Sequence, residues 1–141
     1  MSDKKKELDP ELVKFRDSYV EMFGHLPPLP GGRFAFSGDM NPEFLRDAER
    51  LRGKAFYNKT FDMKTTQLIL FGMLLVEHNQ IAAQAHASAA RRAGATWEEL
   101  HAVANLAFLF RGLSAANVGA ETLMKLAEEE AAGAAWTTVG K

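Results

Sequence analysis

The side chains best suited to proton chemistry in this sequence are its four histidines, and His86 is the strongest candidate among them. An imidazole is the side chain that ordinarily gains and loses a proton near pH 7. His86 is surrounded in sequence mainly by alanines, so its ring would stand on a helix face with space in front of it. Asn79 lies two turns earlier on the same face. The pattern predicts an acid/base group with an amide nearby; the alternative is a buried histidine bonded to a carbonyl.

The other histidines lack the spacing of a metal site. Glu77 and His78 precede His86 by nine and eight residues, whereas the ligands of a helical metal site recur at i and i+4. Glu77 and His78 also point about 100° apart on a helix, so they cannot both face His86, although either could complete a site from a neighbouring subunit. His101 follows a helix start and is expected at the surface or in an interface. We therefore predict no metal ligand.

Two further polar side chains are candidates for substrate binding together with Asn79. Gln67 lies in an apolar stretch, residues 66–71, where a polar side chain needs a hydrogen-bond partner. Alternatively, Gln67 faces solvent. Arg111 stands at an expected helix break, where its guanidinium could hold a carboxylate. An exposed arginine without such a role is the ordinary alternative.

The composition excludes several classes of function. The 17 basic and 18 acidic residues leave a net charge of −1, which lacks the electrostatic signature of a nucleic-acid-binding protein. The apolar runs 68–76 and 102–110 are too short to cross a bilayer, and the charged residues 1–7 show no secretory signal. The absence of cysteine removes disulfides and thiolate chemistry and fits a cytoplasmic protein.

Helix start and stop signals recur along the sequence, and they predict an all-α fold with about six helices. Asp9-Pro10-Glu11 and Asn41-Pro42-Glu43 are helix starts, which predict helices over 10–23 and 42–57. The expected apolar stripe of the second of these consists of Phe44, Leu45, Ala48, Leu51 and Ala55. Asp62 opens a third helix.

The second half of the chain continues this pattern. The helical signal extends over 77–92, and Thr96 and Glu99 form a capping box before the next helix. A break near Arg111 precedes a last helix over about 115–131. Apolar residues surround the helices at 68–76 and 102–110 on every side, which predicts burial between subunits as well as within one.

The segment 26–40 interrupts the helical pattern, because it contains three prolines and several glycines. We expect a packed loop there, with a lid over a pocket as the alternative. The resulting organisation is an N-terminal helical arm over 1–60 with this loop, a helical core over 61–131, and a flexible tail over 132–141, all in one folded unit.

Three segments resemble one protein family. They are Phe-Asp-Met-Lys-Thr-Thr-Gln-Leu-Ile at 61–69, His86 with the following Ala-Ser-Ala-Ala-Arg-Arg-Ala-Gly-Ala-Thr-Trp-Glu-Glu-Leu, and Phe-Arg-Gly-Leu-Ser-Ala-Ala at 110–116. Together they resemble the carboxymuconolactone decarboxylase and alkylhydroperoxidase D superfamily over about residues 61–126. The resemblance implies an alkylhydroperoxidase D-like helical domain that assembles as trimers or hexamers, with a pocket near the subunit interface.

The peroxidase branch of this superfamily uses a relay of Glu, Cys-x-x-Cys and His. The relay histidine corresponds to His86, but the two cysteine positions hold Asn79 and Ala82, and the glutamate position holds Gln67. Three of the four groups are therefore missing. Without a thiolate there is no nucleophile for a peroxide, so a thiol peroxidase is excluded.

The decarboxylase branch acts on a lactone acid from aromatic-ring breakdown, without metal or organic cofactor, and retains a histidine. A later histidine of that branch is absent here, where Asn105 and Leu106 stand. We therefore predict a cofactor-independent enzyme for a small organic acid or lactone, in which His86 transfers the proton. Gln67 and Asn79 would orient the substrate or stabilise an oxyanion, and Arg111 would hold a carboxylate. The alternatives are a non-catalytic homo-oligomer that binds a small ligand at a relic site, and a partner-docking module.

Overall fold

The computed structural model describes residues 7–133 of the chain and contains, within that range, seven helices and no strand. The all-α prediction is confirmed, with one helix more than the six expected. The chain forms two compact units, residues 1–58 and residues 59–141, each with its own set of packed helices. Most of the tail predicted over 132–141 lies outside the described residues.

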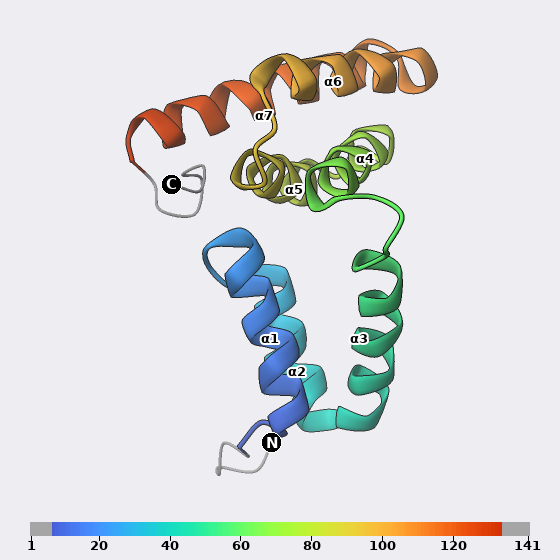
Figure 1. Ribbon diagram of the computed structural model, residues 1–141, viewed down its shortest axis with the longest axis vertical. Coiled ribbons are helices and arrows are strands. Elements are labelled where there is room, and N and C mark those ends of the chain that lie inside the picture. Colours follow the sequence, from blue (N-terminus) through green and yellow to red (C-terminus); the bar gives the residue numbers. More distant parts are fainter. Residues whose placement is uncertain (1–6, 134–141) are drawn as a thin grey trace. The chain divides into compact units, whose positions relative to one another are not determined.

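The first unit consists of α1 (Pro10–Phe23), α2 (Pro28–Met40) and α3 (Pro42–Phe56) (Figure 1). Each of these helices begins at a proline, whose missing N–H costs nothing at the first helical position. Two of them also have a side-chain cap: Asp9 accepts from the Glu11 N–H at 2.9 Å, and Asn41 accepts from the Phe44 N–H at 3.1 Å. These local signals confirm the helices predicted over 10–23 and 42–57.

The prediction of a loop over 26–40 is wrong, since most of that segment forms α2. Pro28 and Pro30 fall in the first turn of the helix, where backbone N–H groups have no acceptor within the helix. The first N–H that does bond is that of Gly31, which donates to the Pro27 carbonyl at 2.9 Å. Phe34 is buried edge-on against the ring of Tyr19 and anchors the helix. The lid alternative assumed an irregular loop and therefore loses its basis.

The buried face of α3 also differs from the predicted stripe. Leu45 is buried as predicted, but Phe44 and Leu51 are exposed, and Glu49 and Phe56 are buried with Leu45 instead. The stripe failed because a charged residue, Glu49, occupies a core position between two apolar ones. Glu49 can be buried there because its carboxylate bonds Tyr19 and Arg33.

The second unit consists of α4 (Met63–Val76), α5 (Gln80–Arg92), α6 (Trp97–Arg111) and α7 (Leu113–Ala131). Helices α4 and α5 form one layer, and α6 and α7 form a second layer packed on it (Figure 1). The core between them is built from leucines, Phe71 and many alanines. Small residues let the helices approach closely: a Cβ added to Gly119 would lie 2.9 Å from the Cβ of Ala104.

Helix α5 begins three residues later than predicted. The helical signal from 77 is interrupted by a turn in which His78 takes a positive φ of 62°, and Asn79 caps the helix that starts at Gln80. The last helix begins at Leu113, two residues earlier than expected. The capping box is confirmed: Glu99 N–H donates to Thr96 Oγ1 at 3.1 Å, and Thr96 N–H donates to the Glu99 carboxylate at 2.9 Å.

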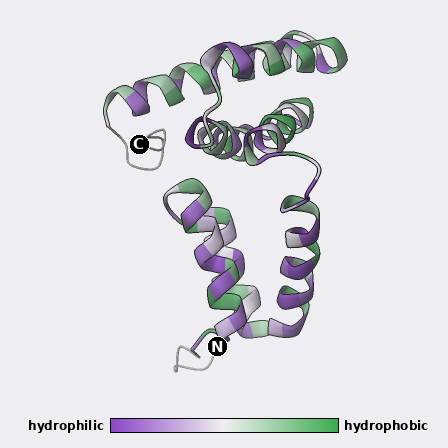
Figure 2. Cartoon of the chain, viewed as in Figure 1, coloured by the Kyte–Doolittle hydropathy of each residue, from purple (hydrophilic) through white to green (hydrophobic). Residues whose placement is uncertain are grey.

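Hydrophobic residues recur along α4 and α6 (Figure 2), but not all are buried within one chain. Met73 on α4 is exposed, and an exposed apolar group surrounds the α6–α7 junction, where the side chain of Phe110 is 88% exposed; its members are Leu106, Leu109, Phe110 and Leu113. Burial of these side chains between subunits stays a prediction. No helix in the described part of the chain is long and apolar enough to span a membrane.

Candidate functional site

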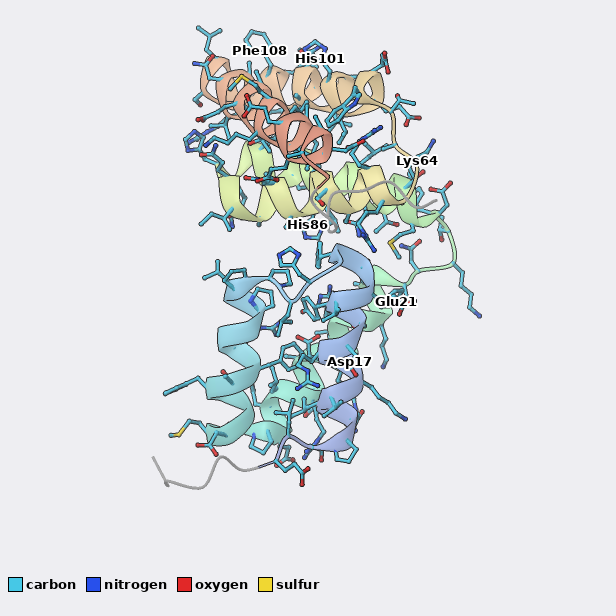
Figure 3. All side chains as sticks on the ribbon, turned by 90° about the vertical axis from the view of Figure 1, so that its left-hand side faces the viewer. Asp17, Glu21, Lys64, His86, His101 and Phe108 are labelled. Atoms are coloured by element: carbon cyan, nitrogen blue, oxygen red, sulfur yellow. The ribbon has the colours of Figure 1, made fainter. Side chains whose placement is uncertain are left out.

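His86 and Gln67 meet across the α4–α5 layer. His86 lies in the middle of α5 and Gln67 in the second turn of α4, and His86 Nδ1 is 2.7 Å from Gln67 Oε1. The Gln67 side chain is fully buried, with 0% exposure, while His86 is partly exposed. Figure 3 shows His86 on the side of this layer that faces away from α6. The polar residue that needed a partner and the candidate acid/base group are therefore partners of each other.

A methionine determines which end of the Gln67 amide faces the ring. Gln67 Nε2 lies 3.5 Å from Met63 Sδ, one turn earlier on α4. A thioether sulfur has only lone pairs to offer, so it must face the amide NH₂ rather than the oxygen. The Gln67 oxygen then accepts from Nδ1 of His86, which assigns the ring proton to Nδ1. With the proton on Nδ1, the lone pair of the neutral imidazole is on Nε2.

The first turn of α4, which carries Met63 and directly precedes Gln67, is held by charged groups. Asp62 caps it by accepting from the Thr65 N–H at 2.7 Å, and this hydrogen bond holds the pKa of Asp62 below its usual value. Lys64 Nζ donates to the Glu99 carboxylate at 3.0 Å and so joins the start of α4 to the start of α6. These contacts hold the first turn of α4 in place, one turn before Gln67.

Asn79, a predicted substrate-binding residue, has a structural role in the fold. Its Oδ1 accepts from the Ala82 N–H at 3.2 Å and caps α5. Seven residues separate it from His86, which corresponds to about 10 Å along the helix axis. No hydrogen bond joins Asn79 to His86 among the described residues.

Arg111 is exposed at the end of α6, in the other layer of the unit. Helix α6 packs chiefly on α4 and α7, and His101 and Phe108 lie on its outer side (Figure 3). Within residues 7–133, no hydrogen bond or ion pair connects Arg111 with His86. One chain therefore places Gln67 in hydrogen-bond contact with His86 but neither Asn79 nor Arg111. The surface position of His101 agrees with its prediction.

A second polar cluster, which the sequence reasoning missed, lies in the first unit. The carboxylate of Glu49 is 1% exposed and accepts from the Tyr19 hydroxyl at 3.1 and 3.2 Å. Arg33 Nη1 lies 2.5 Å from the same carboxylate, and Arg33 Nη2 donates to the Tyr19 oxygen at 2.7 Å. Arg52 completes the cluster, with its Nη1 3.9 Å from Glu49. The detectable signal was a glutamate at the apolar position four residues after Leu45.

Burial shapes the chemistry of this cluster, which we call the Glu49 cluster (Tyr19, Arg33, Glu49 and Arg52). Loss of solvent raises the pKa of the Tyr19 phenol above its usual value. The phenol therefore stays protonated and donates to Glu49. The Arg52 guanidinium stacks over the Tyr19 ring, 4.0 Å from its centroid, and over the Phe56 ring, 4.8 Å from its centroid.

No group of three or more histidine, aspartate or glutamate side chains that could hold a metal ion occurs among the described residues.

Comparison with known proteins gives one family. The sequence model of the family described as "Carboxymuconolactone decarboxylase family" matches residues 42–125, which is more than half of the chain. The match starts at α3, earlier than the resemblance expected from residue 61, and includes Gln67, Asn79, His86 and Arg111. Searches of the curated proteins and of the solved structures each found no match.

Proposed function

Since the chain belongs to the carboxymuconolactone decarboxylase family, we propose that it is a cofactor-independent enzyme acting on a small organic acid or lactone. The reaction is acid/base chemistry of the lyase type: decarboxylation, isomerisation or hydrolysis. The observation that carries this proposal is the 2.7 Å contact between Gln67 Oε1 and His86 Nδ1. The chain contains no cysteine, and Asn79 and Ala82 stand at the two thiol positions of the peroxidase branch, so the proposal does not include thiol peroxidase activity.

In the proposed mechanism, Nε2 of His86 takes a proton from the substrate and the imidazolium later returns it. Gln67 acts through His86 and is a positioning residue: it holds the ring in one orientation and one tautomer without adding charge. A neutral acceptor does not stabilise the imidazolium as a carboxylate would, so the ring is suited to act first as a base. Arg111 could hold a substrate carboxylate only where another copy of the chain presents it.

The test is turnover of a panel of lactones and ring-cleavage acids by wild type and two histidine variants. His86→Ala should lower kcat/KM by about 10²- to 10⁴-fold, the usual contribution of a general acid/base group. His101→Ala is the matched control, because His101 is exposed on the outer side of α6, and it should leave kcat/KM nearly unchanged. Full activity of His86→Ala on a true substrate would contradict the proposed role.

A second candidate function is small-ligand binding by a non-catalytic oligomer with a relic site. It is favoured by the finding that neither Asn79 nor Arg111 forms a hydrogen bond with His86 within one chain. A thermal-shift screen of acids, lactones and phenols separates the two functions. A ligand at 100 times its Kd adds about 2.7 kcal/mol of stability. A shift without turnover of the same compound would favour binding over catalysis.

Both functions include assembly into a homo-oligomer, a trimer or hexamer. The supporting observation is the exposed apolar group at the α6–α7 junction, since a chain this small exposes such groups at a cost unless another surface covers them. Sedimentation velocity at micromolar concentration tests this part, and a stable monomer would contradict it. A cytoplasmic location, suggested by the cysteine-free composition, is part of the same proposal.

A further inference from the structure

The charges of the Glu49 cluster do not balance. Two guanidinium groups, those of Arg33 and Arg52, face a single carboxylate, so the cluster carries one positive charge in excess. Arg33 satisfies the carboxylate directly, at 2.5 Å, and also bonds the Tyr19 oxygen. Arg52 stands at 3.9 Å, beyond hydrogen-bond distance. The excess charge is therefore located on Arg52.

Arg52 differs in this respect from its neighbour Arg50 on the same helix. Arg50 donates from Nε and Nη2 to both oxygens of Glu11, at 2.7 and 2.8 Å, so the fork of its guanidinium is occupied. Arg52, in contrast, forms no hydrogen bond with any residue of the described range. Its side chain is nevertheless only 24% exposed, because it is stacked over the rings of Tyr19 and Phe56.

An arginine in this arrangement is preorganised to bind an anion. Stacking on two rings immobilises the side chain before a ligand arrives, which lowers the entropy lost on binding. The side chain keeps 24% exposure, and a planar carboxylate can accept two parallel hydrogen bonds from a guanidinium group. The single excess charge matches a monoanion, whereas a doubly charged phosphate would leave the half-buried cluster negative.

We propose that Arg52, with Arg33 beside it, forms a binding site in the first unit for a small monocarboxylate. Arg52 donates two hydrogen bonds to the ligand, and Arg33 and Tyr19 hold Glu49 so that its carboxylate does not take that place. The site lies wholly within residues 1–58 and does not depend on a catalytic role of His86.

The experiment is a titration of the full chain with benzoate, followed by the NMR signals of the arginine side-chain Nε–Hε groups. Benzamide, which has the same shape without the charge, is the control ligand. Benzoate should shift the Arg52 signal along a saturable curve, and benzamide should leave it in place. Absence of saturation with benzoate, or an equal response to benzamide, would overturn the proposal; this outcome needs no variant and cannot be confused with misfolding.

Two charge-matched variants locate the site. Arg52→Gln should weaken benzoate binding by about tenfold or more, the effect of losing hydrogen bonds to a charged group. Arg50→Gln removes the same charge from an arginine whose fork is already occupied, and it should change the Kd by less than about twofold, as expected for an exposed ion pair. Equal weakening by both variants would show a bulk charge effect and overturn the proposal.

The same titration distinguishes this inference from the proposed function. His86→Ala should bind benzoate in the first unit as wild type does. If that variant loses turnover but keeps the Arg52 response, both conclusions stand. If benzoate moves only signals of the second unit, the carboxylate site is wrong and the catalytic proposal is unaffected.

Discussion

Replacing Gln67 with glutamate tests the central contact of the candidate site. The substitution Gln67→Glu keeps the shape of the side chain and exchanges the amide for a carboxyl group, 2.7 Å from His86 Nδ1 and at a position with 0% exposure. It also restores the residue type that the peroxidase branch has at this position. An ionised carboxylate there should stabilise the protonated imidazole, so the pH at which the His86 ring titrates should rise relative to wild type.

Two opposing energies determine how far it rises. With charge centres about 4 Å apart, the attraction is about 4 kcal/mol at an effective dielectric constant of 20. Burying the new carboxylate beside Met63 costs several kcal/mol, although the ring N–H compensates part of this cost. A rise of about 1 to 2 pH units is therefore expected, within the range caused by neighbouring carboxylates, and it corresponds to about 1.4 to 2.7 kcal/mol.

The assay is an NMR pH titration of the histidine ring signals in wild type and Gln67→Glu. His86→Ala assigns the signal, and the exposed ring of His101 is the internal control, whose midpoint should not move. Carbon-13 labelling of glutamate reports whether the introduced carboxyl is ionised. An ionised carboxyl together with an unchanged His86 midpoint would refute the conclusion that the residue 67 side chain faces Nδ1.

Two further predictions concern stability. Thr122 is fully buried on α7, and its Oγ1 has no hydrogen-bond partner among the described residues, so Thr122→Val should raise the free energy of unfolding by about 1 kcal/mol or more; urea unfolding that shows an equal or lower midpoint would contradict this. The pKa of Glu99 is lowered, first by the hydrogen bond from the Thr96 N–H and then by Lys64. Because the folded-state pKa is the lower one, this contribution is present above the ordinary value of 4.5 and is lost as the pH falls below it. Glu99→Gln, which keeps a capping side chain, should reduce the acid sensitivity of the thermal midpoint; an unchanged pH profile would exclude this role.

Local signals in the sequence predicted most of the fold. Helix starts at Pro10 and Pro42 and the capping box of Thr96 and Glu99 depend on residues within one turn, so they can be recognised without knowing the tertiary structure. Helix α2 was missed for the converse reason. Counting prolines and glycines as breakers ignores position, and Pro28 and Pro30 fall where a helix needs no N–H.

The contacts of the two polar sites could not be predicted in the same way. The sequence indicated that Gln67 needed a partner and that His86 was a candidate acid/base group. These two residues are 19 positions apart in the sequence, and their pairing depends on how α4 packs against α5. The burial of Glu49 depends on Tyr19 and Arg33, which come from two other helices. Side-chain pairs of this kind are set by packing between helices, about which spacing along a single helix carries no information.

The position of Asn79 agrees with the proposed function, in which the helical frame carries an acid/base group and no thiol relay. Asn79 stands at the first thiol position and at the N-cap of α5, where unpaired backbone N–H groups and the helix dipole favour a negative charge. In this chain the amide oxygen of Asn79 accepts from the Ala82 N–H, so the same end of the helix is satisfied without any charge. Gln67 replaces a charged group by a neutral one in a parallel way. Compared with the relay that the resemblance implies, both residues keep hydrogen bonds and carry no charge, and in the proposed function His86 is the group that moves the proton.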